Sequence, residues 1–342
     1  MAQPAISFQL EDRDPHEGVL HLKAGETLRG AVTVQSAADA HVHSFRLDLH
    51  WRTEGKGNPA KGVGASVELA REGRWVSGAT QSFSFVIQVP WGPLSHSGRI
   101  LNVSWELEAK GDRSFPQADF RESMPVVLSA APDMTRFDLG PSPQKERELE
   151  ALKGGLAGLW LALGIILLLG GIVFGAAMGW EIQGVRRYAL LAFMGLGFLL
   201  TLRGFWGRLG RGKLGEPTVR ISSSELRRGE EVHFDVAIRP GKKTELRSLK
   251  AILECEERVV QGHGQYQSHH RKTIYEETVV LAEPRAIGPQ RGLRKTGVLR
   301  IPADAPPTFG APSNRVVWWL RFEADLAGWP DWKEPHLLTV RP

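Results

Sequence analysis

The chain has 342 residues, of which 42% are hydrophobic and 24% are charged, so it is long enough for two ordinary packed domains. Its net charge of +5 is modest, and no RNA- or DNA-binding signature accompanies it, which argues against a nucleic-acid partner. The single cysteine excludes an internal disulfide and favours a reducing compartment.

The N-terminal half is expected to form antiparallel strands. It starts without a basic segment followed by an apolar run, so we expect no secretory signal peptide. Four segments alternate apolar and polar residues with the period of half-buried strands: 28–34, 45–51, 83–89 and 101–109. Short strands at regular spacing, without helical periodicity, favour a β-sandwich over residues 1–140.

Two connections in this half contain residue types that can take part in chemistry. The loop from Arg52 to Gly64 is rich in glycine, but a phosphate-binding loop needs Gly-Lys-Ser/Thr leading into a helix, so we expect a flexible hairpin. Ser95, His96 and Ser97 lack a Gly-x-Ser-x-Gly elbow and a positioned acid. We therefore predict no nucleophile here.

An apolar run without any charge extends from Gly154 to Met178. A helix needs about 20 apolar residues to cross the hydrocarbon core of a membrane, and a helix of a soluble protein carries one polar face. We therefore predict a membrane span over about 155–178, following a linker over 141–153. The glycines in this run suit close approach of a second helix.

A second, shorter apolar run begins at Tyr188 and reaches Leu202. It spans the membrane if the helix covers 187–206, with Arg203 reaching the headgroups and with Tyr188 and Trp206 at the two interfaces. A re-entrant or interfacial helix is the alternative. The short connection between the runs predicts an antiparallel transmembrane hairpin over 154–206.

Basic residues predict the orientation of this hairpin. Those on its outer flanks are Lys145, Arg147, Lys153, Arg203, Arg208, Arg211 and Lys213. The hairpin loop carries only Arg186 and Arg187. The positive-inside rule then places both flanks in the cytoplasm, in an integral protein of the inner (cytoplasmic) membrane. The basic linker 207–216 also suits anionic lipid headgroups, although simple topology marking explains it equally well.

The C-terminal half repeats the pattern of the N-terminal half in the same order. The matching segments are 25–34 with 229–238, 45–51 with 249–256, 85–90 with 297–302, 101–110 with 315–325, and 124–128 with 336–340. Trp318 matches Trp105. A repeat of this length predicts two copies of one domain, the second over 217–342.

Three features of this repeat resemble the arrestins and the related arrestin-like trafficking and sporulation-control proteins. A Gly-Glu turn leads into a strand, an apolar strand ends in the Pro-rich segment 89–98, and a strand bearing Trp105 follows. The looser counterpart is 301–314, followed by Trp318. The resemblance implies two immunoglobulin-like sandwiches of about seven strands each. The chain departs from arrestins because an apolar hairpin joins the two halves, and no phosphate-sensing polar core is carried over.

The histidines are weighed as metal ligands. His263, His269 and His270 could suit zinc in principle, but basic residues adjoin them and no carboxylate lies within the cluster, so we expect a solvated loop. His41 and His43 alternate at the start of a strand, which is typical of an exposed edge. We predict no metal site.

Cys255 lies in a strand-like alternation between Glu254 and Glu256. We expect it to be a small core residue rather than a nucleophile, because adjacent carboxylates raise the pKa of a thiol.

These observations predict a mainly β protein with two tandem antiparallel, arrestin-like sandwiches separated by a two-helix transmembrane hairpin. No arrangement of catalytic residues is found, and we expect no cofactor. The preferred function is a non-enzymatic scaffold or adaptor that contacts membrane lipid and a protein partner at the cytoplasmic face. The alternative is an accessory subunit of a membrane transport or envelope complex, and an enzyme is a third, weaker reading.

Overall fold

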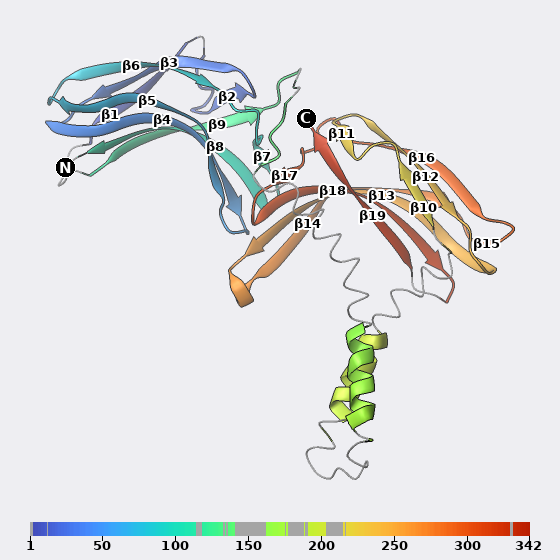
Figure 1. Ribbon diagram of the computed structural model, residues 1–342. Helices are drawn as coiled ribbons and strands as arrows, with labels where there is room; N and C mark the ends of the chain where they lie inside the picture. Colours follow the sequence, from blue (N-terminus) through green and yellow to red (C-terminus); the bar gives the residue numbers. More distant parts are fainter. Residues whose placement is uncertain are drawn as a thin grey trace.

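β-Strands make up most of the regular structure in the computed structural model. The structure describes all residues except 1–2, 12, 114–117, 133, 135, 141–161, 175, 177–187, 189–190, 203–214, 216 and 329–330. Figure 1 shows two β-rich bodies, formed by residues 5–129 and 218–341, with a pair of short helices outside them. The fold is mainly β, as the alternating segments predicted.

The first body contains two sheets. The smaller one has the order β1 (Ala5–Leu10), β3 (Thr27–Gln35), β6 (Thr80–Gln88). The larger one has the order β2 (Leu20–Lys23), β9 (Phe120–Ser129), β8 (Leu101–Arg113), β4 (Ala40–Gly55), β5 (Lys61–Trp75), with β7 (His96–Ser97) beside β8. The β2–β9 pair is parallel and the other pairs are antiparallel. Buried apolar residues from both sheets, such as Leu49, Ile87 and Leu107, form the core.

The second body repeats this order strand for strand. Its smaller sheet has the order β10 (Thr218–Ile221), β12 (Glu231–Ile238), β16 (Leu293–Arg300). Its larger sheet has the order β11 (Glu225–Arg227), β19 (Trp332–Arg341), β18 (Asn314–Leu326), β13 (Thr244–Gln261), β14 (Ser268–Ala282), with β17 (Phe309–Gly310) beside β18. The β11–β19 pair is parallel, as β2–β9 is. The additions are β15 (Arg285–Ile287), which pairs with β13, and the 3-10 turn η1 (Gly264–Tyr266).

Trp105 and Trp318 occupy equivalent places in the two sandwiches. Both side chains are buried, on β8 and β18, at 1% and 0% exposure. Each indole Nε1 donates a hydrogen bond to the carbonyl of the proline twelve residues before it: Trp105 to Pro93 at 2.8 Å, and Trp318 to Pro306 at 2.9 Å. A buried indole N–H needs a hydrogen-bond acceptor. The two copies of the domain therefore share both the buried tryptophan and the carbonyl that accepts from it.

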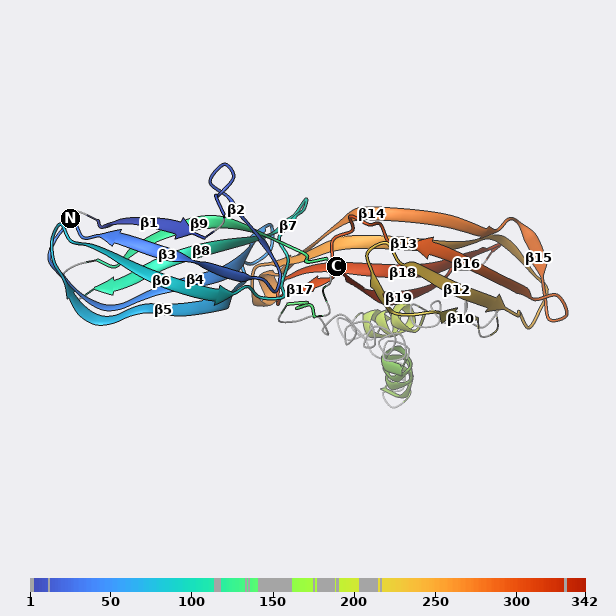
Figure 2. The same ribbon diagram turned by 90° about the horizontal axis from the view of Figure 1, so that it is seen from above.

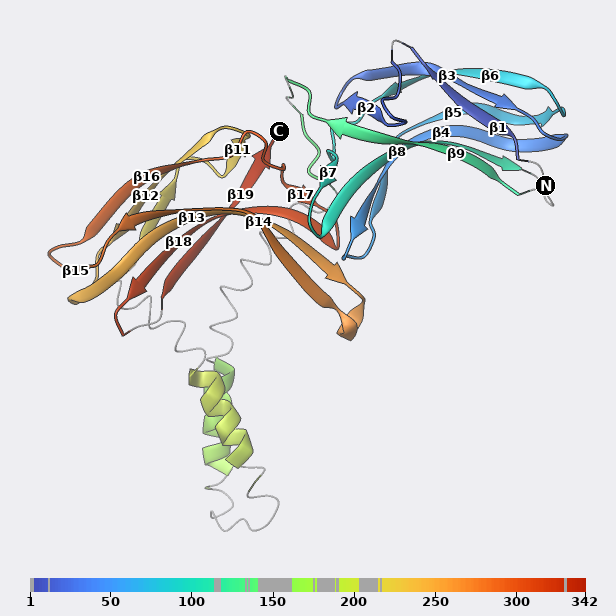
Figure 3. The same cartoon turned by 180° about the vertical axis from the view of Figure 1, so that it is seen from behind.

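The two helices comprise residues 162–174 and 191–202, which run antiparallel (Figure 3). A Cβ atom added at Gly164 would lie 2.5 Å from the backbone nitrogen of Thr201, and one at Gly197 would lie 3.0 Å from the Cβ of Leu167. Small residues therefore permit the contact, as the sequence suggested.

Among the described residues, no helix is both long and apolar enough to cross a membrane. The spans predicted over about 155–178 and 187–206 extend into residues outside that description.

Candidate functional site at the contact between the sandwiches

The connection between β4 and β5 contacts the second sandwich (Figure 2). The backbone N–H of Asn58 donates to the carbonyl of Val260 at 2.9 Å. The Asn58 side chain donates to the carbonyl of Gly262 at 2.8 Å and accepts from its N–H at 2.9 Å. The expected hairpin over 52–64 is present, since β4 and β5 pair antiparallel on either side of the connection. Its tip is not free, however, because three hydrogen bonds hold it against the β13–β14 hairpin.

Asn314, at the start of β18, extends this contact into the interior. Its side chain is 2% exposed. The amide nitrogen donates to the hydroxyl of Thr53 at 3.0 Å and to the carbonyl of Asn58 at 2.6 Å. The Thr53 hydroxyl also accepts from the N–H of Ala60 at 2.8 Å. Buried polar groups that satisfy one another in this way specify one relative arrangement of the two sandwiches.

Glu257 is the charged centre of the contact. It lies on β13 and its side chain is fully buried. One carboxylate oxygen lies 2.9 Å from Nε2 of His96 on β7. The other accepts from the backbone N–H groups of Arg99 at 3.0 Å and Ile100 at 2.8 Å. A Cβ atom at Gly98 would collide with the carboxylate, so the turn at 98–100 can approach it only with glycine there.

The surroundings of Glu257 keep its carboxylate ionised. Burial acts to raise the pKa of Glu257, but the hydrogen bond from His96 and those from the backbone of Ile100 and Arg99 outweigh it, so the pKa is lowered. All of these donors belong to the first sandwich, whereas the carboxylate belongs to the second. The buried carboxylate of the second sandwich is thus bound by hydrogen-bonding groups of the first, which links the two bodies.

An apolar contact lies beside this polar cluster. The ring of Trp51 on β4 meets the ring of Phe309 on β17 edge to face, with centroids 5.9 Å apart. The N–H of Gly310 donates to the carbonyl of Leu139, which follows the first sandwich. The contact therefore combines a desolvated aromatic pair with satisfied polar groups, as stable interfaces do.

The opposite face of β13 carries a second charged cluster. Glu254 forms an ion pair with Arg321 and accepts from the Thr273 hydroxyl at 2.8 Å. Glu256 pairs with Arg258 at 2.7 Å and with Arg271 at 3.4 Å. Burial is the main cause that raises the pKa of Glu254, and the charge of Glu256 adds to it against the hydrogen bond from Thr273.

Cys255 lies between these two carboxylates in the chain, but its side chain is buried on the core face of β13. Burial raises the pKa of its thiol, and the nearby charges of Glu257, Glu256 and Glu254 add to the effect. The prediction of a small core residue is confirmed, and burial raises the thiol pKa more than the neighbouring carboxylates do.

Of the six residues predicted to lie at the membrane interface, the structure describes one. Tyr188 is helical and 74% exposed. The other membrane-interface candidates lie outside the described residues: Arg203, Trp206, Arg208, Arg211 and Lys213.

The three loop histidines do not come together as a metal site in the described part of the chain. His263 precedes η1, while His269 and His270 lie on β14 opposite Val260 and Val259. Among the described residues, the three potential ligands that lie close enough to share an ion are His41, His43 and Glu72, on β4 and β5.

Neither a protein-family model nor a curated protein is similar enough to this chain to match it. Among solved structures, the sporulation control protein Spo0M from Bacillus subtilis is similar over 37% of this chain and 49% of its own, with 20% identity and a TM-score of 0.31. At that TM-score the likeness carries no argument about fold or function. The class that the strand order defines is a mainly β protein with two tandem sandwiches.

Proposed function

We propose that this protein is a non-enzymatic scaffold or adaptor, anchored at the cytoplasmic face of the membrane, whose two arrestin-like sandwiches bind a protein partner as one unit. The observation that carries the proposal is the outward-facing apolar surface of the paired helices. It is supported by the bonded contact between the sandwiches and by the basic flanks of the hairpin.

The helix pair presents large apolar side chains to its surroundings. Those exposed are Leu163, Ile165, Ile166, Leu169, Ile172, Val173, Phe174, Leu191, Phe193, Leu196, Phe198, Leu199 and Leu202. The face towards the neighbouring helix is instead formed by small residues such as Gly164 and Gly197. A hairpin in water would reverse this arrangement, and lipid is the environment that suits it.

The contact between the sandwiches supports the proposed topology. Asn58 and Glu257 bond directly across it, so the segments on either side of the hairpin lie together. Two soluble bodies that contact each other must lie on the same side of a membrane, which requires an even number of crossings between them. The basic residues flanking the hairpin favour the cytoplasmic side.

Partner binding is proposed for the free edges of the large sheets. β5 and β14 stand at the ends of their hydrogen-bonded orders, and each has 15 residues. A long edge strand offers unpaired N–H and C=O groups to an extended peptide. Because the hydrogen bonds of Glu257 hold the two bodies together, the edges β5 and β14 would be presented to a partner in one fixed relative position.

The alternative is an accessory subunit whose hairpin packs against helices of a membrane complex. Gly170 and Gly195 favour it, because a Cβ atom added at either position would meet nothing within 4 Å. These glycines face away from the hairpin contact and leave room for a further helix.

Fractionation, reporter fusions and affinity capture test the proposal together. The wild-type chain should resist carbonate extraction from membranes, whereas the triple variant Ile166→Asn, Leu169→Asn, Val173→Asn should be released. Alkaline phosphatase should be inactive when fused after Pro342 and active near Trp180. The reverse pattern, or full extraction of the wild type, would contradict the anchor.

Capture in mild detergent then separates the two functions. The adaptor predicts a partner that binds equally to wild type and to the double variant Gly170→Leu, Gly195→Leu. The accessory subunit predicts co-purifying membrane proteins that this variant loses, while Gly164→Leu serves as the control that disturbs the hairpin itself.

A further inference from the structure

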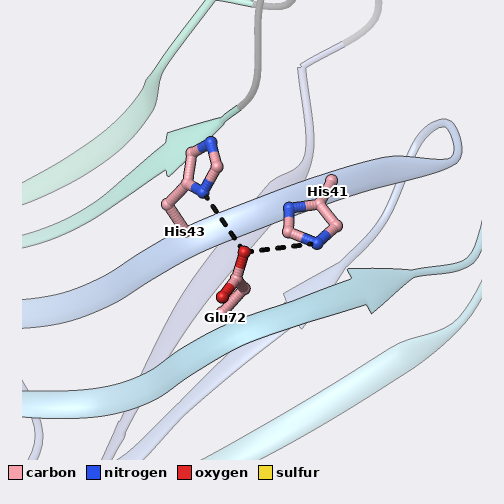
Figure 4. Close-up of side chains that lie close together, drawn as sticks. All are labelled: His41, His43 and Glu72. Atoms are coloured by element: carbon pink, nitrogen blue, oxygen red, sulfur yellow. Dashed lines mark ion pairs between the residues drawn. The ribbon is translucent and has the colours of Figure 1, made fainter.

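We propose that His41, His43 and Glu72 form a binding site for a divalent transition-metal ion, and that zinc is the ion that their donor atoms fit best. Figure 4 shows the three side chains turned towards one another on neighbouring strands. The site lies on β4 and β5 of the first sandwich, and β5 is also one of the two edges proposed above for partner binding. The proposal of a metal site rests on the three donor atoms and not on that partner.

Strand geometry places the three donors. Alternation along β4 points His41 and His43 outward and Val42 into the core, where it is 0% exposed. Glu72 lies on β5, which pairs antiparallel with β4. The pairs Val42–Gly73 and Ser44–Arg71 bracket His43 and Glu72, so these two residues stand opposite each other. The backbone register, and not a mobile loop, therefore sets their separation.

The distances are close to those of a zinc site. Nε2 of His41 lies 3.8 Å from Oε1 of Glu72, and Nδ1 of His43 lies 3.9 Å from the same oxygen. All three donor atoms lie within 4.8 Å of one another. Tetrahedral zinc with ligands at about 2.0–2.1 Å needs donors roughly 3.3 Å apart. The side chains are 45%, 54% and 70% exposed, so small rotations can close the remaining gap.

The charges around the site favour a cation. Arg74 stands opposite His41 in the register, but its guanidinium pairs with Asp39 at 3.1 Å. In the described chain, the Glu72 carboxylate faces an imidazole nitrogen of each of the two histidines. Two imidazole nitrogens and one carboxylate oxygen, all within 4.8 Å of one another, are donors of the kind that a divalent cation accepts. In the described part of the chain, the loop histidines 263, 269 and 270 are not grouped with a carboxylate in this way.

Two imidazoles and a carboxylate are a common zinc donor set, which leaves a fourth position for water or for a ligand from a partner. The exposure of the three side chains makes this position accessible from solvent. Copper(II) would compete, because it binds imidazole more tightly than zinc does. Protons compete for the same lone pairs, so the affinity for zinc should fall on acidification.

Zinc titration of the purified, chelator-treated full chain in detergent tests the site. We expect one zinc ion per wild-type chain, at least tenfold weaker binding in His43→Ala and in Glu72→Gln, and a zinc-dependent rise of the melting temperature only in the wild type. The matched control is the triple variant His263→Ala, His269→Ala, His270→Ala, which removes more imidazoles and should bind zinc normally.

Glu72→Gln keeps the shape of the side chain, so its loss of binding cannot be ascribed to misfolding. No saturable binding by the wild type would overturn the proposal. So would undiminished binding in His43→Ala and Glu72→Gln, or loss of binding in the loop variant.

Discussion

Replacing Glu257 by Gln should open the contact between the two sandwiches. The amide keeps the size of the side chain but removes the charge and one acceptor oxygen. Its oxygen can accept from the backbone N–H groups of Arg99 and Ile100 or face His96, but not both, so the charge-assisted hydrogen bonds are lost. Hydrogen bonds to a charged group are each worth about 1.5–3 kcal/mol, and loss of one partner of a buried pair costs about 3–5 kcal/mol. We therefore expect Glu257→Gln to make the association of the two sandwiches less favourable by about 3–5 kcal/mol.

Distances between two spin labels would report this opening. Val76→Cys in the first sandwich and Val298→Cys in the second provide exposed sites, at 54% and 45%. The native Cys255 should remain unlabelled because it is buried and its thiol pKa is raised. Wild type should give one narrow distribution of distances, and Glu257→Gln a broad one.

Glu254→Gln is the matched control. Glu254 is also buried, at 3% exposure, but its partners Arg321 and Thr273 belong to the same sandwich. This variant should lower the melting temperature of the second sandwich without broadening the distances. If the two variants behave alike, or if Glu257→Gln leaves the narrow distribution of distances intact, then Glu257 does not hold the two sandwiches together.

The contact should also depend on pH. The pKa of Glu257 is lower in the folded chain than in the unfolded one. Its contribution is therefore fully present above the unfolded value of about 4.3 and is lost as the pH falls through the folded value. Acidification should broaden the distances in the wild type and leave Glu257→Gln, which is already open, unchanged.

Three further predictions concern the cores. Trp105→Ala and Trp318→Ala should each cost about 3–5 kcal/mol in chemical denaturation, because each removes a buried indole and its hydrogen bond; melting like the wild type would refute the equivalent core positions. Gly64→Ala should cost about 1–3 kcal/mol because the new Cβ would lie 2.7 Å from the Trp105 ring, whereas Gly73→Ala on the same strand, 3.8 Å from its nearest atom, should be nearly neutral. A thiol reagent at pH 8 should leave Cys255 unmodified until the chain is denatured, because burial raises the pKa of its thiol; rapid labelling of the folded chain would place it at the surface.

The sequence was sufficient for the strands and for their repetition. Alternation with a period of two is local, so the apolar faces of segments such as 101–109 and 315–325 follow from the residues themselves. The match between Trp105 and Trp318 also follows from the sequence order. Each indole donates to a proline carbonyl that precedes it by twelve positions, so this hydrogen bond forms within one short segment of the chain.

The contact of Glu257 with the first sandwich could not be predicted in the same way, although the sequence does show a charged residue on an apolar strand face. Glu257 continues the core face of β13 formed by Leu253 and Cys255, and a charge on an apolar face requires a partner. Its partners His96 and Ile100 lie 161 and 157 residues away. Periodicity within one segment contains no information about such a partner.

The histidine site shows the same division between local and tertiary information. Alternation predicts that His41 and His43 share an exposed face. Glu72 joins them only through the register of β5 against β4, which shifts between Phe45 and Arg46 and again between Leu49 and His50. A shift of one residue would turn Glu72 to the opposite face. The tertiary structure alone decided this site and the contact between the sandwiches, because both depend on how separate segments dock and not on the pattern within any one of them.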